Sequence, residues 1–483
     1  MTDDDRRRRL TLFATALGSS LAFLDATVVV VALPTIERDL GLGLSGQQWV
    51  FLSYSLALAA LYLFSGAVGD RRGRREVFLV GVAGFALASL LAGAAPSGGV
   101  LILARTLQGV AGAFVTTNSL ALLREVYGRE AGRAIGLWTA LTAVATVIGP
   151  PLGGALVEWA SWRWIFLINL PLAAATVALA LAGRCRVRER QRTGALDLPG
   201  AALAAVGLAA LTYGLVEGAD RGFAATWWLL IVGVTAAAAF LVVEHRSSEP
   251  MLPLAVFRRR NFAAANLETF LVYAALSGVS LFSALYLQFL GLSPFEAGLT
   301  AVPVSIALIV LSGRFGGLAD RRGPRLLLTV GPLGLGLATL LLATVDDTAE
   351  LWFAGSAALV VFSVGLAMIV APITATALKA APPEYAGIAS GVNTTLSRLG
   401  GLLAVAVVGV VVTLVFEASG GSAEAVPLAT GQEDPELRAA SVDGFRAGMT
   451  LVAALAFSGA AVAAVGISNR EARAEATAEP AGS

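Results

Sequence analysis

Three chemically versatile residue types are almost missing from this chain of 483 residues: cysteine, histidine and lysine occur once each, as Cys185, His245 and Lys379. One cysteine and one histidine cannot form a disulfide or a Cys/His zinc cluster. The single lysine lies in the segment TALKAAPPE and not in the Gly-x-x-x-x-Gly-Lys-Ser/Thr loop that cradles nucleotide phosphates. Redox, zinc and ATP-driven chemistry are therefore not expected, and neither a metal nor a cofactor is predicted.

Charged side chains are also scarce. They make up 14% of the residues, about half the share of an average soluble domain, whereas 57% of the residues are hydrophobic. A membrane helix uses about 20 mostly apolar residues, so this chain can furnish about a dozen spans or more. The net charge of +1 gives no support for nucleic-acid binding. We therefore predict an all-α polytopic membrane protein whose surroundings are the lipid bilayer, with no nucleic-acid partner.

Fourteen apolar stretches of membrane length predict fourteen transmembrane helices. They lie at about residues 10–34, 48–69, 76–95, 100–123, 133–157, 163–183, 197–217, 224–243, 261–290, 296–318, 325–345, 351–378, 386–416 and 444–467. No Ala-x-Ala site follows the first stretch, so it is interpreted as an uncleaved span and not as a signal peptide. The longest stretch that is not apolar covers about residues 417–443.

The distribution of basic residues predicts the orientation of the chain. With a cytoplasmic N-terminus, the inner loops and tails hold 26 of the 34 basic residues and the outer loops hold 5. The other three, Arg105, Arg314 and Arg398, fall within spans or at their ends. Because basic loops stay in the cytoplasm, we expect both termini on the cytoplasmic side of the cell inner (plasma) membrane.

An internal repeat predicts the domain organisation. The segments GAVGDRRGRREVFLVG at 66–81 and GGLADRRGPRLLLTVG at 316–331 are identical at eight of sixteen positions, with an offset of 250 residues. Each copy links the second and third spans of a group of six. The sequence thus predicts two homologous six-helix bundles, at 10–183 and 261–467, and two additional linker helices at 197–243.

Six segments, each a weak signal alone, carry a family resemblance. They are LDATVVVVALP at 24–34, GAVGDRRGRR at 66–75, LILARTLQGVAGA at 101–113, GPPLGG at 149–154, WRWIFLINLP at 162–171 and ASGVNTTLSRLGGLLAVAV at 389–407. In this order, over nearly the whole chain, they resemble the major facilitator superfamily, in its fourteen-span drug:proton antiporter branch. The resemblance implies the major-facilitator fold, with two six-helix bundles and two extra central helices.

Asp25 is the only charged residue between Arg9 and Glu37, in the middle of the first span. Burial of a charged group there should cost about 2.5 to 3.5 kcal/mol. Its helical face consists of small and apolar residues: Ala14, Gly18, Ala22, Val29 and Ala32. Such a face packs against other helices, where desolvation makes proton uptake accessible near neutral pH. Asp25 is therefore a predicted proton-binding residue; the alternative is a structural carboxylate permanently paired with an arginine.

Arg105 is the predicted partner of Asp25. It begins a polar stripe on the fourth span, at spacings of three or four residues: Arg105, Gln108, Gly112, Thr116 and Ser119. Both residues lie in the outer half of the predicted topology, so a water-lined pair is expected. The resemblance implies that Arg105 takes part in proton coupling; the alternative is an arginine that only satisfies backbone carbonyls.

Glu268 is a second intramembrane carboxylate, about two turns into the ninth span. Like Asp25, it is a candidate for proton coupling or substrate contact, although the family pattern has no counterpart for it. The alternative is a side chain that reaches back to the cytoplasmic surface.

The repeated cytoplasmic loop is predicted to act as a conformational latch. By resemblance, its residues hold the cytoplasmic side closed while the site opens outward: Gly66, Asp70, Arg71, Gly73, Arg74, Asp320 and Arg321. Carboxylates and arginines can grip helix ends by charge and dipole. Topology alone explains some of the arginines, but it does not explain why Gly66 and Asp70 recur as Gly316 and Asp320.

A glycine- and proline-rich segment lies toward the outer end of the fifth span, at Gly149, Pro150, Gly153 and Gly154. Proline removes a backbone donor and glycine allows close approach, so a bent and tightly packed helix is predicted. By resemblance, this segment is typical of exporters that work by antiport. The alternative is a passive kink.

Taken together, these features predict a secondary active transporter, not an enzyme, which exports amphipathic or cationic small molecules in exchange for protons by alternating access. We expect a monomer driven by the proton gradient. A dedicated exporter of one metabolite or natural product is the main alternative. A membrane enzyme is disfavoured because no span holds a cluster of catalytic residues, and a channel or receptor is disfavoured by the internal repeat.

Overall fold

The structure is a computed structural model that describes residues 3–128, 131–183, 198–247, 254–347, 350–382, 385–422 and 425–472. Nearly all of these residues are helical, and none of them forms a strand. Cys185 and the first residue of the predicted linker at 197 lie outside the described residues.

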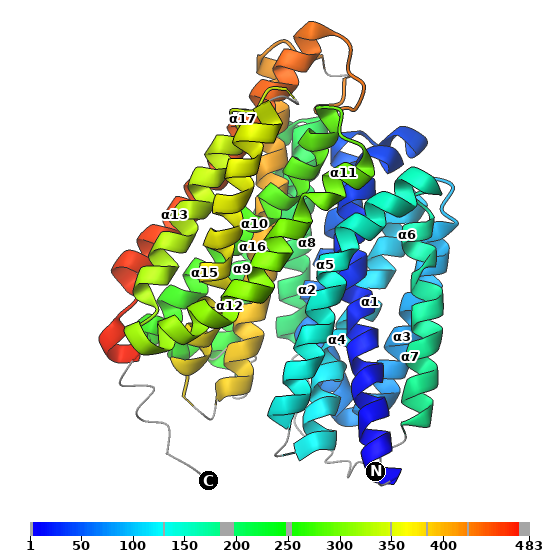
Figure 1. The fold of residues 1–483 in the computed structure, drawn as a ribbon, viewed down its shortest axis with the longest axis vertical. Coiled ribbons are helices and arrows are strands. Elements are labelled where there is room, and N and C mark those ends of the chain that lie inside the picture. The colour runs from blue at the N-terminus through cyan, green and yellow to red at the C-terminus, as the bar shows by residue number, and fades with distance from the viewer. Residues whose placement is uncertain are drawn as a thin grey trace. The chain divides into compact units, whose positions relative to one another are not determined.

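Contacts between residues divide the chain into two units, Met1–Ala209 with Leu292–Leu299, and Ala210–Gly291 with Thr300–Ser483. The first unit contains α1 (Asp3–Leu40), α2 (Gly43–Arg72), α3 (Arg74–Gly93), α4 (Gly98–Tyr127), α5 (Ala131–Trp159), α6 (Trp164–Leu167), α7 (Asn169–Ala182) and α11 (Pro294–Leu299). Within it, α1 runs beside α4, α5 and α7 (Figure 1). The division into two bundles and a separate helix pair remains a prediction.

The boundary between the two units passes through α8 (Leu198–Arg221). The second unit also contains α9 (Phe223–Arg246), the short 3-10 helix η2 (Leu254–Arg258), α10 (Arg260–Phe289), α12 (Ala301–Arg322), α13 (Arg325–Leu342), the π-helical turn η3 (Leu351–Gly355), α15 (Ser356–Lys379), α16 (Ala386–Ala418) and α17 (Pro435–Gly466).

The described residues contain fourteen spans of membrane length when the bent helix α2 is counted as one. Thirteen are helices that are long and apolar enough to cross a membrane, with α11 and α12 joined in one of them. The fourteenth is α2, which is bent by 53° between Gly43–Tyr62 and Phe64–Arg72. Every stretch predicted from the sequence corresponds to one of these spans, so the prediction of an all-α polytopic membrane protein is confirmed.

The last helix begins earlier than predicted, at Pro435 and not at residue 444. Its N-cap is Asp434, whose side chain accepts hydrogen bonds from the backbone of Glu436 (2.9 Å) and Leu437 (3.4 Å). Proline is favoured at the first helical position because its missing N–H would have no partner there. The residues between Pro435 and 444 include charged side chains, so hydrophobicity does not indicate that they are helical. The Asp-Pro-Glu sequence is nevertheless a helix-start signal.

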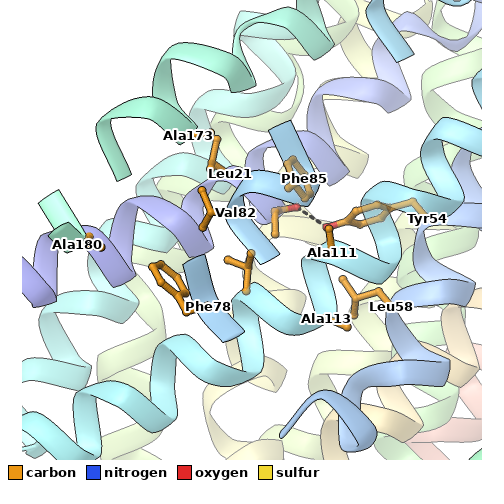
Figure 2. Close-up of a cluster of buried hydrophobic side chains, with 13 residues drawn as sticks. Leu21, Tyr54, Leu58, Phe78, Val82, Phe85, Ala111, Ala113, Ala173 and Ala180 are labelled. Atoms are coloured by element: carbon orange, nitrogen blue, oxygen red, sulfur yellow. Dashed lines mark hydrogen bonds between the residues drawn. The ribbon is translucent and has the colours of Figure 1, made fainter. Parts of the chain in front are cut away.

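The first unit has a core to which five helices contribute. Figure 2 shows Leu21 of α1, Phe78, Val82 and Phe85 of α3, and Tyr54 of α2 among the buried side chains, beside alanines of α4 and α7. The Tyr54 hydroxyl donates a hydrogen bond of 3.0 Å to the carbonyl oxygen of Ala22. Small residues between the aromatic rings allow the helices to approach closely, as is usual in membrane bundles.

The second unit is held together around α10. The rings of Tyr286 on α10 and Phe445 on α17 are stacked at 3.7 Å between centroids, and the Tyr286 hydroxyl donates to the carbonyl oxygen of Val345 (2.5 Å). On α16, a Cβ atom at Gly400 would lie 2.2 Å from the carbonyl oxygen of Phe270. The α10 and α16 backbones are therefore in near contact.

Candidate functional site

Asp25 lies near the middle of α1, and its side chain has no exposed surface. The helical face predicted to pack inward is buried: Ala14, Gly18, Ala22, Val29 and Ala32. The carboxylate therefore faces the interior of the first unit, among α1, α3, α4 and α7. An ionised group in such a place needs a counter-charge and hydrogen-bond donors.

Arg105 of α4 supplies the counter-charge. Its Nη1 atom donates to Asp25 Oδ2, and its Nε atom donates to the carbonyl oxygen of Val50 at 3.2 Å. The guanidinium carbon lies 4.5 Å from the centroid of the Tyr54 ring and 5.8 Å from that of Phe166, so the cation also rests on two aromatic faces. Only 1% of the Arg105 side chain is exposed. The expected water-lined pair is instead a direct, buried ion pair.

The second carboxylate oxygen is held by two amides. Gln108 Nε2 donates to Asp25 Oδ1 at 3.0 Å, and Asn169 Nδ2 donates to the same atom at 2.9 Å. Both amides also reach Ser89 Oγ, at 2.8 and 3.3 Å. Gln108 in addition accepts a hydrogen bond from Arg105 through its Oε1 atom at 3.0 Å. We call Asp25, Arg105, Gln108, Asn169 and Ser89 the Asp25 cluster.

Sequence reasoning found three members of the Asp25 cluster and missed two. Asn169 and Ser89 were missed because each is a single polar residue within an apolar run. A signal existed for Asn169, since an amide within a membrane span needs a partner. Ser89 carries no comparable signal, because a serine can satisfy its hydroxyl on its own helix.

The charges within the Asp25 cluster balance one another. With Asp25 ionised, the pair is neutral overall and its charged atoms have partners. Proton binding at Asp25 would leave a buried cation, whose remaining acceptors are the Val50 carbonyl and Gln108 Oε1. Such a change in buried charge favours another packing of the surrounding helices.

The first copy of the repeated cytoplasmic loop, at 66–81, is hydrogen-bonded to α4. Arg74 donates to Asp70 Oδ1 from Nε (2.9 Å) and Nη2 (2.7 Å), and its Nη1 atom donates to the carbonyl oxygen of Ala121 (3.0 Å). Gly73 between α2 and α3 has φ = +91°, a conformation that residues other than glycine rarely adopt. Gly66 lies close to α4, because a Cβ atom there would be 3.0 Å from Thr117 Cγ2.

The second copy makes the same connection with a different cation. Pro324 stands where the first copy has Arg74, and Asp320 instead pairs with Lys379 Nζ, at the end of α15, at 2.8 Å. Gly323 repeats the positive φ of Gly73, at +93°. In both copies an aspartate at the end of one span is thus linked to the fourth span of its own group of six. Arg71 and Arg321 are exposed.

The glycine- and proline-rich segment of α5 lies between α1 and α11. A Cβ atom would lie 2.0 Å from Thr27 Oγ1 if added to Gly149, and 2.8 Å from the Val28 carbonyl oxygen if added to Gly153. The helix continues without a break through Pro150 and Pro151. These glycines place α5 directly on the turn of α1 that follows Asp25.

The same segment of α5 also packs on α11. A Cβ atom on Gly154 would lie 2.3 Å from the carbonyl oxygen of Pro294. Glu158 Oε2 accepts a hydrogen bond from the backbone N–H of Phe295 (3.1 Å), and the Trp159 and Phe295 rings are 5.0 Å apart. These contacts hold α11 on α5 within the first unit.

Substitution of Gly153 by alanine is expected to destabilise the first unit by about 1 to 3 kcal/mol, because the new methyl group meets α1 backbone that cannot rotate away. At Gly136, on the exposed face of the same helix, an added Cβ would meet no described atom within 4 Å other than its chain neighbours and its own helix backbone. Gly136→Ala should be neutral or stabilising by up to about 1 kcal/mol. Thermal inactivation of the two variants in detergent checks this. Equal midpoints would show that the contact with α1 is not tight.

Glu268, the third predicted coupling residue, is not part of the Asp25 cluster. It belongs to the second unit, where it lies on α10 facing α17, and it is fully buried. The structure therefore brings Asp25 and Arg105 together within the first unit, whereas Glu268 belongs to the second unit.

Comparison with known proteins identifies the family. The family model for the Major Facilitator Superfamily matches residues 15–405. The chain belongs to the Major Facilitator Superfamily. It is a transporter rather than an enzyme, as predicted.

Curated relatives within the superfamily include resistance and export proteins. The chain is 37% identical over 417 residues to the multidrug resistance protein Stp of Mycobacterium tuberculosis, covering 84% of this chain and 76% of that one. It is 36% identical over 464 residues to the puromycin resistance protein pur8 of Streptomyces alboniger, covering 94% and 89%. It is 34% identical over 409 residues to the tetracenomycin C resistance and export protein of Streptomyces glaucescens, covering 83% and 75%.

Solved structures of the superfamily share the fold. A bacterial homolog of the human lysosomal transporter Spinster, inward-facing and unoccupied, matches with a TM-score of 0.68 at 17% identity, covering 95% of this chain and 97% of that one. The human organic anion transporter MFSD10 matches with a TM-score of 0.59 at 16% identity, covering 94% and 99%. The predicted major-facilitator fold is therefore confirmed.

Proposed function

We propose that this member of the superfamily is a proton-coupled antiporter that exports amphipathic small molecules, cationic ones among them, by alternating access. The observation that carries the proposal is the Asp25 cluster: a carboxylate in the middle of a span, fully buried and paired with one arginine. Intramembrane carboxylates are costly and mark proton or substrate pathways.

In the proposed cycle, Asp25 binds a proton from outside and releases it to the cytoplasm. While ionised, Asp25 holds α1 to α4 through Arg105 and to α7 through Asn169. Protonation weakens both connections, because a neutral carboxyl group accepts hydrogen bonds less strongly than a carboxylate. We propose that the weaker connections of α1 allow the conformational change that releases substrate outside, so that substrate release follows proton uptake. Each proton that enters is worth about 2.3 kcal/mol per 100 mV of membrane potential, in addition to the pH gradient.

Relatives named for resistance support export as the direction of transport. Three of them are named for multidrug, puromycin or tetracenomycin C resistance, and one of these is also named an export protein. We further propose that the protein lies in the cell inner membrane as a monomer, with both termini in the cytoplasm and with the proton gradient as its only energy source. The excess of arginine in alternate loops supports this orientation.

A dedicated exporter of one natural product is the second candidate. Two of the relatives above are each named for a single compound, puromycin or tetracenomycin C. The spans also offer few acidic groups to attract a wide range of cations. Efflux measured for a panel of cationic dyes and single antibiotics, in cells with and without the protein, separates the two candidates. A multidrug antiporter moves several chemically unrelated compounds, whereas a dedicated exporter moves one.

The transport test uses the purified chain in proteoliposomes with ethidium and puromycin as probes. A pH gradient imposed in the antiport direction is expected to drive uphill movement of at least one probe, and a protonophore should stop it. Saturable movement that is indifferent to the pH gradient would rule out proton coupling.

A further inference from the structure

Glu268 is the most isolated acid in the described residues. It lies eight residues after Arg260, the first residue of α10, which is about 12 Å along the helix. Its side chain has no exposed surface, and neither carboxyl oxygen has a hydrogen-bond partner among the described residues. This is the opposite of Asp25, whose two oxygens accept three hydrogen bonds.

The surface that covers Glu268 is α17. A Cβ atom on Gly459 would lie 4.0 Å from Glu268 Cγ and 3.1 Å from Val272 Cγ2, so α17 passes directly over this side chain. One heptad later, a Cβ atom on Gly466 would lie 2.7 Å from Ala264 Cβ. No charged residue occurs on α17 between Arg446 and Gly466. Glu268 is thus enclosed in an apolar contact between two helices.

The polar neighbours of Glu268 on α10, Asn266 and Thr269, make their hydrogen bonds to α16 and to the α10 backbone and not to Glu268. Asn393 of α16 donates to Thr269 Oγ1 (2.8 Å) and to Asn266 Oδ1 (3.3 Å). Asn266 in turn donates to the carbonyl oxygen of Phe262, and Thr269 to that of Ala265. This network joins α10 to α16, whereas Glu268 faces α17.

No charged group on the described elements that pack on α10 is paired with Glu268. The elements packed on α10 are α15, α16, α17 and η2. The ionisable side chains that they carry are Lys379 on α15, Arg398 and Glu417 on α16, Arg258 in η2, and Glu436, Arg438, Asp443 and Arg446 on α17. Within the described part of the chain, none of them bonds to Glu268. On α10 itself, Arg260 and Tyr273 are the other ionisable groups that lie within three turns. A carboxylate without a partner in such surroundings takes up a proton instead of remaining charged.

We propose that Glu268 is a second proton-binding site, which keeps its proton while α10 and α17 are packed together and releases it when that contact admits water. The proposal rests on the proton-coupled antiport proposed above and adds a second proton to its cycle. The step is a simple proton transfer from the Glu268 carboxyl group to water, leaving a hydrated carboxylate.

At the Arg260 end of α10, hydrogen bonds from Arg260 and Asn261 close the contact between α10 and α17; we call these hydrogen bonds the clamp. Arg260 donates to the carbonyl oxygens of Gly466 (2.9 Å) and Val465 (2.6 Å). Asn261 exchanges two hydrogen bonds with the backbone of Ser468, at 3.1 and 2.8 Å. Breaking a few such side-chain hydrogen bonds costs less free energy than separating two helices that pack through apolar side chains. In the proposed release step these hydrogen bonds break, α17 moves off Ala264, and water enters along α10 toward Glu268.

The transport experiment compares Glu268→Gln with the native chain in proteoliposomes under a pH gradient of one unit, with the membrane potential held at zero. Glutamine has nearly the same shape but carries no titratable proton. We expect counterflow exchange of ethidium to be retained and the maximal substrate gradient to fall about tenfold, the contribution of one proton per pH unit. Glu471→Gln, which removes an exposed carboxylate, is the matched control and should leave the gradient unchanged.

Equal gradients for Glu268→Gln and the native chain would overturn the second site. If the native chain itself shows no pH-driven transport, the proposed antiport fails, and the second test still decides the state of Glu268. In that test, a hydrophobic carbodiimide, which reacts with protonated carboxyl groups, is added to the native chain and labelled peptides are identified by mass spectrometry. We expect labelling at Glu268 that decreases when Asn261→Ala opens the clamp at alkaline pH. Absence of labelling, or labelling that the variant does not change, would contradict the proposal.

Discussion

Replacement of Asp25 by asparagine is expected to abolish efflux driven by a pH gradient while substrate counterflow continues. Asparagine keeps the size of the side chain, and its Oδ1 atom can still accept from Arg105, but it cannot bind and release a proton. The amides of Gln108 and Asn169 can rotate to present oxygen to the new Nδ2 atom, so the fold should survive. The expected loss of uphill transport is at least about 100-fold, because a coupling step is removed and not merely slowed.

The matched control is Asp39→Asn. Asp39 lies on the same helix, but it is about half exposed and pairs with Arg163 at 3.0 Å near the end of α1. Exposed pairs of this kind contribute about 0 to 1 kcal/mol, so this variant should transport at nearly the native rate. Uphill transport by Asp25→Asn at the rate of Asp39→Asn would remove Asp25 from the coupling role.

Replacement of Arg105 by methionine is expected to have the largest effect on stability. The change leaves the Asp25 carboxylate buried without a cation, and it also removes the hydrogen bonds to Val50 and Gln108. Breaking one partner of a buried pair typically costs about 3 to 5 kcal/mol. The amount of folded protein recovered and its midpoint of thermal inactivation should both fall strongly, and no pH-driven transport should remain.

The double variant Asp25→Asn with Arg105→Met measures how much of each stability loss comes from the interaction between the two side chains. Removing both charges eliminates the unpaired carboxylate, so the double variant should be more stable than Arg105→Met alone. Arg163→Met, which breaks the exposed pair with Asp39, should lower stability by less than about 1 kcal/mol. Additive losses in the double variant would show that Asp25 and Arg105 do not act together.

The number and order of the spans could be predicted from the sequence, because apolar runs of membrane length are unambiguous in a chain with so few charges. The start of α17 could not be found in this way, since Glu436 and Arg438 interrupt hydrophobicity without interrupting the helix. A cap such as Asp434 is a better guide to a helix end than the apolar run.

The central pair of the site was also predictable, whereas its surroundings were not. Asp25 and Arg105 stand out because each is a charge in an apolar span. Their contact with Asn169 depends on how α7 returns to α1, which no local pattern encodes. The contrast between Asp25 and Glu268 could not be predicted either, because both are single acids in apolar spans and only packing decides which of them finds an arginine.

Proton release on substrate binding tests the coupling role of Asp25 most directly, because it reports coupling at the Asp25 cluster without a membrane gradient. Purified protein in weakly buffered detergent solution is mixed with ethidium or puromycin, and the pH change is followed with an indicator dye. The native chain and Asp39→Asn should release protons, whereas Asp25→Asn should still bind the substrate but lack the Asp25 contribution to that release. Equal proton release by Asp25→Asn and the native chain would contradict the coupling role of Asp25.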